Sequence, residues 1–405
     1  MSLDEALLRS GLNSIVSADS GRISWAKWPQ WCFWGCLGLT IAVTAIRNPI
    51  NEASPPRVAP SIFLSEGIVD ATPVFESSAM GTVAAAPHVH ASTVTRLSSD
   101  RLLAAWFGGS REGASDVAIY LSRWEPSSGA WGEPYPLIDR ASASRELGRY
   151  VKKLGNPVLH RDPRGRVWLY FVTVSTGGWS GSSVSLKWSD DEGASWSEAR
   201  RLITSPFMNI STLVRCPPID LADGGVLLPL HHELLMKFGE LARLDPQGNL
   251  VERYRMNCEA STLQPSLLAT PEGGLVAFYR RGSGEAPYVH ANRSEDGGVT
   301  WTPAEPIDLP NPDASVCVVR RHGAPGGALM AFNPSSKDRK TLALAVSQGD
   351  RGWRIVHTFE GSGEGKELSY PTLIRGRQGE YHLTHTEGRT RIRHVRFNEA
   401  WLEGR

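Results

Sequence analysis

The sequence has no excess of charge of either sign, because 43 lysine and arginine residues are balanced by 42 aspartate and glutamate residues. Proteins that bind nucleic acids usually carry a clear basic patch, so we expect no nucleic-acid partner. Cysteine is also scarce: five occur in 405 residues, and no Cys-x-x-Cys spacing is present. We therefore expect no metal and no cofactor. We interpret Cys216, Cys258 and Cys317 as small buried residues, with one disulfide among them as the alternative.

The sequence also lacks long amphipathic helical patterns. From about residue 70 onward, short apolar runs such as 102–107, 167–174 and 275–279 alternate with turn residues. The chain contains 40 glycines, 27 prolines and 14 tryptophans. Abundant turn formers between short apolar runs are typical of a protein built from many β-hairpins, so we expect an all-β fold.

One turn-bearing segment recurs along this β-rich region. Residues 294–301 follow the pattern Ser-x-Asp-x-Gly-x-Thr-Trp, and residues 189–196 follow it with serine in place of threonine. Degenerate copies end at Trp131 and Trp353. In such a segment the aspartate side chain binds backbone N–H groups of a turn while the tryptophan packs beneath it. Recurrence of one turn indicates a repeat architecture.

The spacing of the copies predicts the number of repeats. Most copies lie roughly 50–65 residues apart, which suits a four-stranded propeller blade. The doubled gap between Trp196 and Trp301 leaves room for a blade without the segment, with residues 238–244 as one of its strands. The region 70–405 is therefore predicted to form a six-bladed β-propeller of about 55 residues per blade. A β-sandwich is the structural alternative, but it does not explain the periodic turns.

The N-terminal region contains an uncharged apolar run at residues 31–46, after Arg22 and Lys27. Such a run is slightly shorter than the roughly 20 residues that span a bilayer. We expect a transmembrane signal anchor that places the propeller on the periplasmic or extracellular side. A cleaved signal peptide, and hence secretion, is the alternative, because residues 43–45 resemble a cleavage site. The predicted organisation is a cytoplasmic tail at 1–30, the anchor at 31–47, a Pro- and Ser-rich linker at 48–69 and the propeller at 70–405.

Propellers bind ligands at one mouth of the central channel, where the inner strands and their loops converge. Polar residues that flank the predicted inner strands are therefore candidates for the site. They are His88 and His90, Arg111, Glu112 and Asp116, Asn156, Arg215, Glu259 and Gln264, Arg280, Asn333 and Arg339, and Glu367 and Tyr370.

The order of these residues resembles the sialidase (neuraminidase) superfamily, in its divergent bacterial branch with Asp-box (BNR) repeats. The resemblance covers roughly residues 85–402 and lies in Arg280 after a strand, Asn333-Pro334 before Arg339, and the pair Ser369-Tyr370. It implies a six-bladed propeller in which three arginines bind the substrate carboxylate. It also implies a tyrosine nucleophile assisted by a glutamate, and an aspartate as general acid and base.

The resemblance assigns roles to several residues of this chain. Tyr370 stands in the position of the nucleophile, and sialidases are the glycosidases that use tyrosine in this way. Arg280 and Arg339 match two arginines of the triad, and their planar guanidinium groups suit a carboxylate. Asp116 lies in the loop expected to carry the acid and base, with Glu112 as its competitor.

Two positions depart from the family pattern. His88 or His90 stands where the first arginine of the triad is expected, and Gln264 stands where the assisting glutamate is expected. Glu259 and Glu367 are the alternatives for the role of that glutamate. Arg111 or Arg215 could complete a rearranged anion site, with Asn156 and Asn333 as further substrate-binding candidates.

The leading hypothesis is a monomeric exo-glycosidase of sialidase-like type that hydrolyses a terminal acidic sugar from a glycan or exopolysaccharide. One alternative is a polysaccharide lyase for uronate-containing glycans, in which His88 or His90 acts together with Tyr370. The other alternative is a carbohydrate-binding propeller without catalytic activity.

Overall fold

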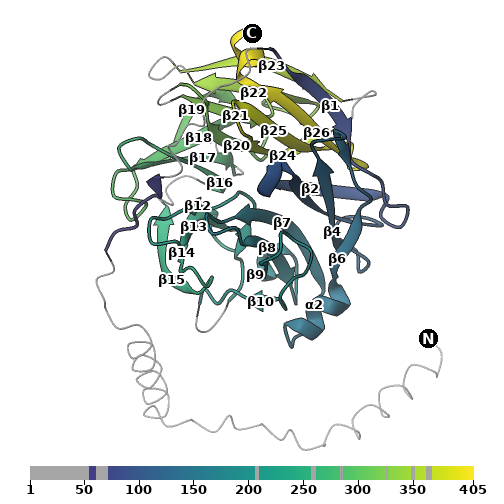
Figure 1. Ribbon diagram of the computed structural model, residues 1–405. Helices are drawn as coiled ribbons and strands as arrows, with labels where there is room; N and C mark the ends of the chain where they lie inside the picture. Colours follow the sequence, from purple (N-terminus) through teal and green to yellow (C-terminus); the bar gives the residue numbers. More distant parts are fainter. Residues whose placement is uncertain are drawn as a thin grey trace, which may run out of the picture. The chain divides into compact units, whose positions relative to one another are not determined.

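The computed structural model describes residues 54–60, 72–205, 209–256, 261–282, 284, 286–324, 327–347, 352–361 and 367–405. Six antiparallel sheets of four or five strands are arranged around a common axis (Figure 1). The prediction of a six-bladed β-propeller is confirmed. The predicted tail and anchor lie outside the described residues, as does most of the predicted linker. Within the described ranges, no helix is both long and apolar enough to cross a membrane.

Each blade begins with its innermost strand, and the blades follow one another along the chain. Blade one contains β2 (His88–Arg96), β3 (Leu102–Gly109), β4 (Ala118–Glu125), β5 (Ala130–Trp131) and β6 (Tyr135–Asp139). Blade two contains β7 (Lys153–Arg161), β8 (Val167–Val174), β9 (Ser182–Ser189) and β10 (Arg200–Arg201). Blade three contains β11 (Leu213–Val214), β12 (Ile219–Asp220), β13 (Val226–His232), β14 (Phe238–Leu244) and β15 (Leu250–Met256).

The remaining blades have four strands each. Blade four contains β16 (Thr262–Ala269), β17 (Leu275–Arg281), β18 (Tyr288–Ser294) and β19 (Glu305–Pro310). Blade five contains β20 (Cys317–Arg320), β21 (Ala328–Phe332), β22 (Thr341–Ser347) and β23 (Trp353–Glu360). Blade six contains β24 (Leu368–Arg375), β25 (Glu380–Glu387), β26 (Arg391–Asn398) and β1 (Phe75–Ala79). The described helical segments are short: α2 (Arg140–Glu146), α3 (Glu399–Glu403), η2 (Ser98–Asp100) and η3 (Trp179–Gly181).

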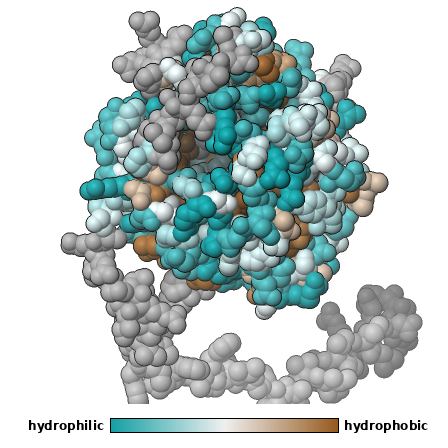
Figure 2. Space-filling view, viewed as in Figure 1, coloured by the Kyte–Doolittle hydropathy of each residue, from teal (hydrophilic) through white to brown (hydrophobic). Residues whose placement is uncertain are grey.

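The core lies between neighbouring blades. Every residue of β3 and of β8 is buried, because each of these strands is covered by a blade on both faces, and such strands read as continuous apolar runs. One apolar cluster joins Leu103 and Phe107 of blade one to Leu169 and Phe171 of blade two. Cys216 and Cys317 are buried free thiols, as predicted, and Cys258 lies outside the described residues. On the face shown in Figure 2, most of the described surface is hydrophilic, with hydrophobic residues in separate patches.

The ring is closed by a strand from the start of the propeller. Strand β1 pairs antiparallel with β26, so the outermost strand of blade six comes from the N-terminal side of blade one (Figure 1). The side chain of Asn398 fixes this junction, because its Oδ1 accepts hydrogen bonds from the N–H groups of Val74 and Trp401. Its Nδ2 donates to the carbonyl of Thr72. One buried amide thus joins both ends of the domain.

The repeated segments form turns between the third and fourth strands of blades two and four. The Asp296 carboxylate accepts hydrogen bonds from the N–H groups of Val299 and Thr300, at 3.0 and 2.9 Å, and from the hydroxyl of Ser294. Trp301 donates from its indole to the carbonyl of Gly298. Blade three lacks the segment and contains the predicted strand as β14. These turns lie at the ends of the blades opposite to the starts of the inner strands.

Replacing Asp296 with alanine should destabilise the domain without affecting its site. Several N–H and O–H groups of the turn would lose their acceptor, and we expect the free energy of unfolding to fall by about 2 kcal/mol. Urea-induced unfolding monitored by tryptophan fluorescence measures this change. The exposed neighbour Glu295 provides the control, since Glu295→Ala should leave the unfolding midpoint unchanged. An equal shift for both variants would contradict a specific role of the Asp296 carboxylate.

Candidate active site

The inner strands of four blades carry the same irregularity near their start. The register shifts between His90 and Thr93 in β2, and at corresponding places in β7, β16 and β24. At each shift one residue other than glycine has a positive φ, which is costly for residues with a side chain. These residues are Ala91 (53°), Asn156 (45°), Gln264 (55°) and Tyr370 (53°). A bulge redirects the side chain of its extra residue. The four shifts therefore mark one end of the channel, which we name the mouth.

Tyr370 is surrounded by cationic and aromatic groups. Its ring centroid lies 4.4 Å from that of His90, at an interplanar angle of 63°. The guanidinium carbons of Arg215 and Arg339 lie 5.1 and 5.9 Å from the ring centroid. The buried Arg215 also holds the bulge, because it donates hydrogen bonds to the carbonyls of Tyr370 and Pro371 at 2.7 and 3.0 Å. Arg215 therefore fixes the backbone position of Tyr370.

Arg280 and Arg339 meet at one acidic residue. Arg280 donates from Nε to the carboxylate of Asp313 at 2.5 Å, and Arg339 donates to the backbone carbonyl of the same residue at 2.5 Å. Burial alone would lower the pKa of Arg280, but attraction to the phenol of Tyr370 and to Asp313 raises it. Two guanidinium groups from blades four and five are thereby gathered beside Tyr370.

The chain of ion pairs continues through Glu367 to blades six and one. Arg339 donates to Glu367 at 3.3 Å, and Arg389 donates from Nε to Glu367 at 2.8 Å. Arg389 also donates to Glu112 at 2.7 Å. Burial alone would raise the pKa of Glu367, but the hydrogen bonds and charge of Arg389 lower it to about 2. Glu367 is therefore ionised at neutral pH and is a weak base, so its geometry suits the positioning of Arg339 and Arg389 better than proton abstraction.

His88 and His90 both lie at the mouth, with ring centroids 6.3 Å apart. His90 is buried, and its pKa lies well below the usual value. Burial is the larger cause, and repulsion from Arg389 is the second. The pKa of His88 is lowered by the same two causes. His90 is thus a neutral imidazole at pH 7. It is a weaker base than a histidine in water, and it is unable to serve as a permanent cation in place of an arginine.

The two candidate acids lie on the loop between β3 and β4. Asp116 is exposed and accepts hydrogen bonds from the N–H and the hydroxyl of Ser110, both at 3.0 Å. Glu112 is paired with Arg389. Because Glu112 is already held by a cation, Asp116 is the better placed of the two to exchange a proton with a ligand. Arg111 is exposed on the same loop.

The remaining candidates differ in their surroundings. Gln264 is buried, and its Oε1 has no hydrogen-bond partner within the described part of the chain. Asn333 is buried and donates to the carbonyls of Thr341 and Leu368, so it ties blade five to the start of β24. Asn156 is half-buried in the bulge of β7. Glu259 lies outside the described residues. Among the residues that the structure describes, no cluster of His, Cys, Asp and Glu side chains is placed to hold a metal ion.

Two residues of this network escaped the sequence analysis, Asp313 and Arg389. Arg389 lies in the turn between β25 and β26, the second and third strands of its blade. In blades one and five, the loops between the second and third strands supplied the candidates Arg111 and Arg339. A search for charged residues in the same loop of the last blade would have found Arg389. Asp313 precedes an inner strand by several residues and has a positive φ of 62°, for which the sequence offers no clear signal.

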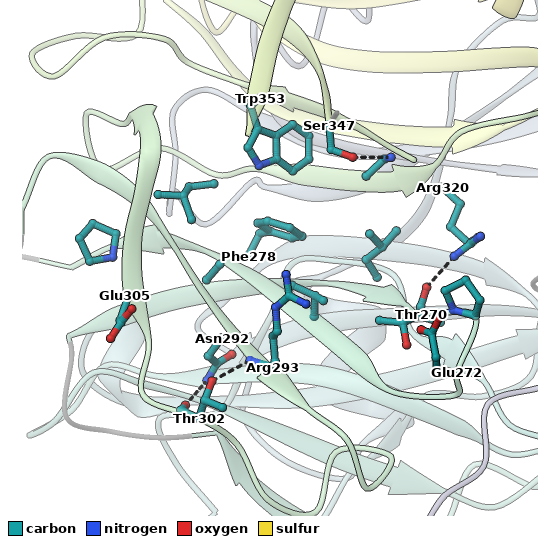
Figure 3. Close-up of a pocket in the computed structure, with 18 of the residues that line it drawn as sticks. Thr270, Glu272, Phe278, Asn292, Arg293, Thr302, Glu305, Arg320, Ser347 and Trp353 are labelled. Carbon is teal, nitrogen blue, oxygen red and sulfur yellow. Dashed lines mark hydrogen bonds between the residues drawn. The ribbon is translucent and has the colours of Figure 1, made fainter. Parts of the chain in front are cut away.

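A groove with a cavity volume of about 970 Å³ lies between blades four and five (Figure 3), and Tyr370 is not among the residues that line it. Phe278 and Trp353 face each other across it, with ring centroids 5.5 Å apart. The groove includes Ala269, at the end of β16 opposite to Gln264. Its buried polar side chain, Asn292, is already bonded to Tyr279 and to the carbonyl of Thr302. We therefore place the candidate active site at the mouth.

The comparisons with known proteins concern the whole propeller. A family model described as a BNR repeat-like domain matches residues 100–383. The fold is similar to the Hadza microbial sialidase Hz136, at 15% identity and a TM-score of 0.65, over 78% of this chain and 66% of that one. The chain thus spans slightly less than two thirds of the length of Hz136.

Two further solved structures are matched over nearly their full length. The intramolecular trans-sialidase from Ruminococcus gnavus, in complex with oseltamivir carboxylate, is 15% identical with a TM-score of 0.63, over 83% of this chain and 98% of that one. The alpha-L-arabinanase from Penicillium chrysogenum, complexed with arabinobiose, is 15% identical with a TM-score of 0.60, over 84% and 98%. No curated protein matches the chain in sequence. At these identities the structural similarities show the fold alone.

Proposed function

Because the chain belongs to the family of BNR repeat-like domains, we propose that it is a glycoside hydrolase that removes a terminal acidic sugar from a glycan or exopolysaccharide. The observation that carries this proposal is the convergence of Arg280, Arg339 and Tyr370 at the mouth. A pair of arginines beside a tyrosine supplies both an anion site and a nucleophile. The sialidase folds to which the chain is similar support the same class of reaction.

In the proposed reaction, Arg280 and Arg339 bind the carboxylate of the sugar. The two guanidinium groups are mostly buried, with side-chain exposures of 15% and 21%, so their attraction for an anion is screened less than at an open surface. Their pairing with Asp313 and Glu367 fixes their orientation before the substrate arrives. A neutral sugar would not engage the remaining N–H groups of the two guanidinium groups as strongly as a carboxylate does, and would bind more weakly.

Tyr370 then attacks the anomeric carbon. The bond from its phenol oxygen to that carbon forms while the glycosidic bond breaks, and Asp116 gives its proton to the leaving oxygen. Water, deprotonated by Asp116, then hydrolyses the glycosyl-tyrosine and restores the phenol. The negative charge that develops on the phenol oxygen during the attack is attracted to Arg280, whose interaction with Tyr370 is described above. This attraction supplies part of what the glutamate replaced by Gln264 would supply. The neutral His90 beside Tyr370 is the candidate that accepts the phenol proton during the attack and returns it when the bond between the sugar and Tyr370 is hydrolysed.

The lyase alternative is favoured by one observation, the contact between the neutral His90 and Tyr370. In an elimination His90 would take the proton next to the carboxylate of a uronate, and Tyr370 would protonate the leaving oxygen. An elimination leaves a C=C bond conjugated to the carboxylate, which absorbs ultraviolet light, whereas hydrolysis does not. Ultraviolet absorbance of the products therefore separates the two reactions.

The test of the proposed function is a comparison of acidic glycans with their methyl esters. We expect the full-length protein to release the terminal sugar from an acidic glycan, and kcat/KM to fall by about 100-fold or more when that carboxylate is esterified, because the ester lacks the charge that Arg280 and Arg339 bind. Product analysis by chromatography measures the release. Equal hydrolysis of acid and ester would overturn the assignment of the anion site, and binding without any turnover would favour the carbohydrate-binding alternative.

The location of the chain is a separate proposal. We propose that residues 31–47 anchor it in a membrane, with the propeller on the periplasmic or extracellular side, where glycans and exopolysaccharides are found.

A further inference from the structure

Blade two presents a further set of side chains at the same mouth, of which only Asn156 was a candidate from the sequence. Lys153 and Asn156 belong to the start of the inner strand β7, and Trp179 lies in η3, in the loop between β8 and β9. Loops between second and third strands form the mouth in blades one, five and six, where they carry Glu112, Arg339 and Arg389. The corresponding loop of blade two brings a tryptophan in place of a charged residue.

The ring of Trp179 is held against the inner strand by a glycine. A side chain at Gly155 would place its Cβ only 2.9 Å from the outer edge of the indole, so only glycine allows the ring to lie so close to β7. Trp179 packs partly against the apolar cluster between blades two and three and remains half-buried. The ring is therefore a fixed and accessible platform, of the kind that stacks on the apolar face of a sugar.

Lys153 lies between this platform and the loop that carries the candidate acids. Its Nζ is 5.8 Å from the centroid of the Trp179 ring. The other side of Lys153 lies against Gly113, because a Cβ added to this glycine would be only 3.3 Å from the Nζ of Lys153. No carboxylate in the described ranges forms an ion pair with Lys153, whereas Arg280, Arg339 and Arg389 are all paired. Lys153 is thus a cation at the mouth for which the described fold supplies no anion.

Asn156 completes the set. It has a φ of 45° at the bulge of β7, the position that Tyr370 occupies in β24. A residue with a side chain pays roughly 1–3 kcal/mol for such a conformation. No hydrogen bond stabilises the Asn156 side chain within the described part of the protein. The amide at this position is consistent with a ligand-binding group held in place by the strand.

We propose that Lys153, Asn156 and Trp179 form a second subsite, which binds the sugar unit on the leaving-group side of the scissile bond, and that this unit is anionic. The assignment of this unit to the leaving-group side rests on the proposed function, because there Asp116 protonates the leaving oxygen. Lys153 lies directly beyond the loop that carries Asp116. Trp179 stacks on the sugar ring, Asn156 binds its hydroxyl groups and Lys153 binds its carboxylate or sulfate. The substrate is therefore an oligosaccharide or polysaccharide with acidic groups on neighbouring units.

Binding measured without turnover tests this subsite. The full-length Tyr370→Phe variant is titrated with galacturonate and with sialic acid oligomers of one to four units, and binding is followed by isothermal titration calorimetry. For the series that binds, we expect the affinity to rise about 10-fold or more from one unit to two, as a stacked and charge-paired unit is added. Adding Lys153→Gln or Trp179→Leu to this variant should remove most of that increment while the affinity for the monosaccharide remains unchanged.

Arg293→Gln is the matched control, because Arg293 is an exposed arginine of the groove between blades four and five. It should retain the full increment. Affinity that does not depend on chain length, or an increment that survives both substitutions, would overturn the subsite alone. Absence of binding by every acidic sugar, including the monosaccharides, would overturn the proposed function and the subsite with it. Circular dichroism of each variant establishes that the propeller is folded.

Discussion

The Tyr370→Phe variant is expected to lose nearly all hydrolytic activity while its fold remains intact. We expect kcat on an acidic aryl glycoside to fall by about 10³-fold or more, because the variant lacks the oxygen that forms the bond to the anomeric carbon. The aromatic ring and its contacts with His90 and Arg215 are retained. Substrate affinity should therefore change little, since Arg280 and Arg339 still bind the carboxylate.

The measurement separates kcat from affinity. Single-turnover kinetics give the rate of the chemical step, and calorimetry gives the dissociation constant of the acidic glycan. Tyr135→Phe is the control, because Tyr135 is 38% exposed and its hydroxyl donates to the carbonyl of Gly193, in a repeated turn at the end of the blades opposite to the mouth. Hydrolysis at the normal rate by Tyr370→Phe would disprove tyrosine as the nucleophile. A loss of binding as large as the loss of rate would indicate that the hydroxyl group serves recognition instead of catalysis.

The fold was largely predictable because its signals are local and repeated. The Asp296 turn is specified by residues within seven positions of one another, and its spacing from the other copies gives the number of blades. Strand β14, in the blade without the segment, was predicted with its observed bounds from its place in the repeat. The closure by β1 was not predicted, because the pairing of Phe75 with Phe397 joins distant parts of the chain and depends on the completed ring.

The site was predictable to a smaller extent. Polar residues that flank the inner strands, such as Gln264 and Tyr370, could be selected because the inner strands recur from blade to blade. Asp313 could not be selected, because its ion pair with Arg280 joins blade four to the segment before blade five. Arg389 could have been selected, because it lies between the second and third strands of its blade, as Arg339 does. The low pKa of Glu367 follows from Arg389 and is invisible in the sequence. The sequence could suggest Glu367 as a base, but only the folded arrangement reveals how strongly it is paired.

Arg215 shows how the fold supports Tyr370 at a cost in stability. It is 2% exposed, and no carboxylate pairs with it within the described residues; its acceptors are the carbonyls of Tyr370 and Pro371 and the hydroxyl of Thr372. Burial lowers its pKa, which reflects the unfavourable loss of hydration of the cation. A buried cation that bonds only to neutral groups gains less free energy from those hydrogen bonds than it loses with its hydration. Its retention is explained by the bulge that it holds, in which Tyr370 has a φ of 53°.

Arg215→Met is therefore expected to separate stability from activity. Methionine fills much of the same volume without a charge, but two carbonyls lose their donor. The two effects largely offset each other, so we expect the free energy of unfolding to fall by only about 1 kcal/mol. We expect kcat to fall by about 100-fold, because the carbonyls of Tyr370 and Pro371 lose their donor and the phenol is no longer held in line with the anomeric carbon. Urea unfolding and steady-state kinetics on the same preparation measure the two effects. A large loss of stability with an unchanged kcat for the folded fraction would show that Arg215 supports the propeller core, whereas the expected pattern makes it a positioning residue for Tyr370.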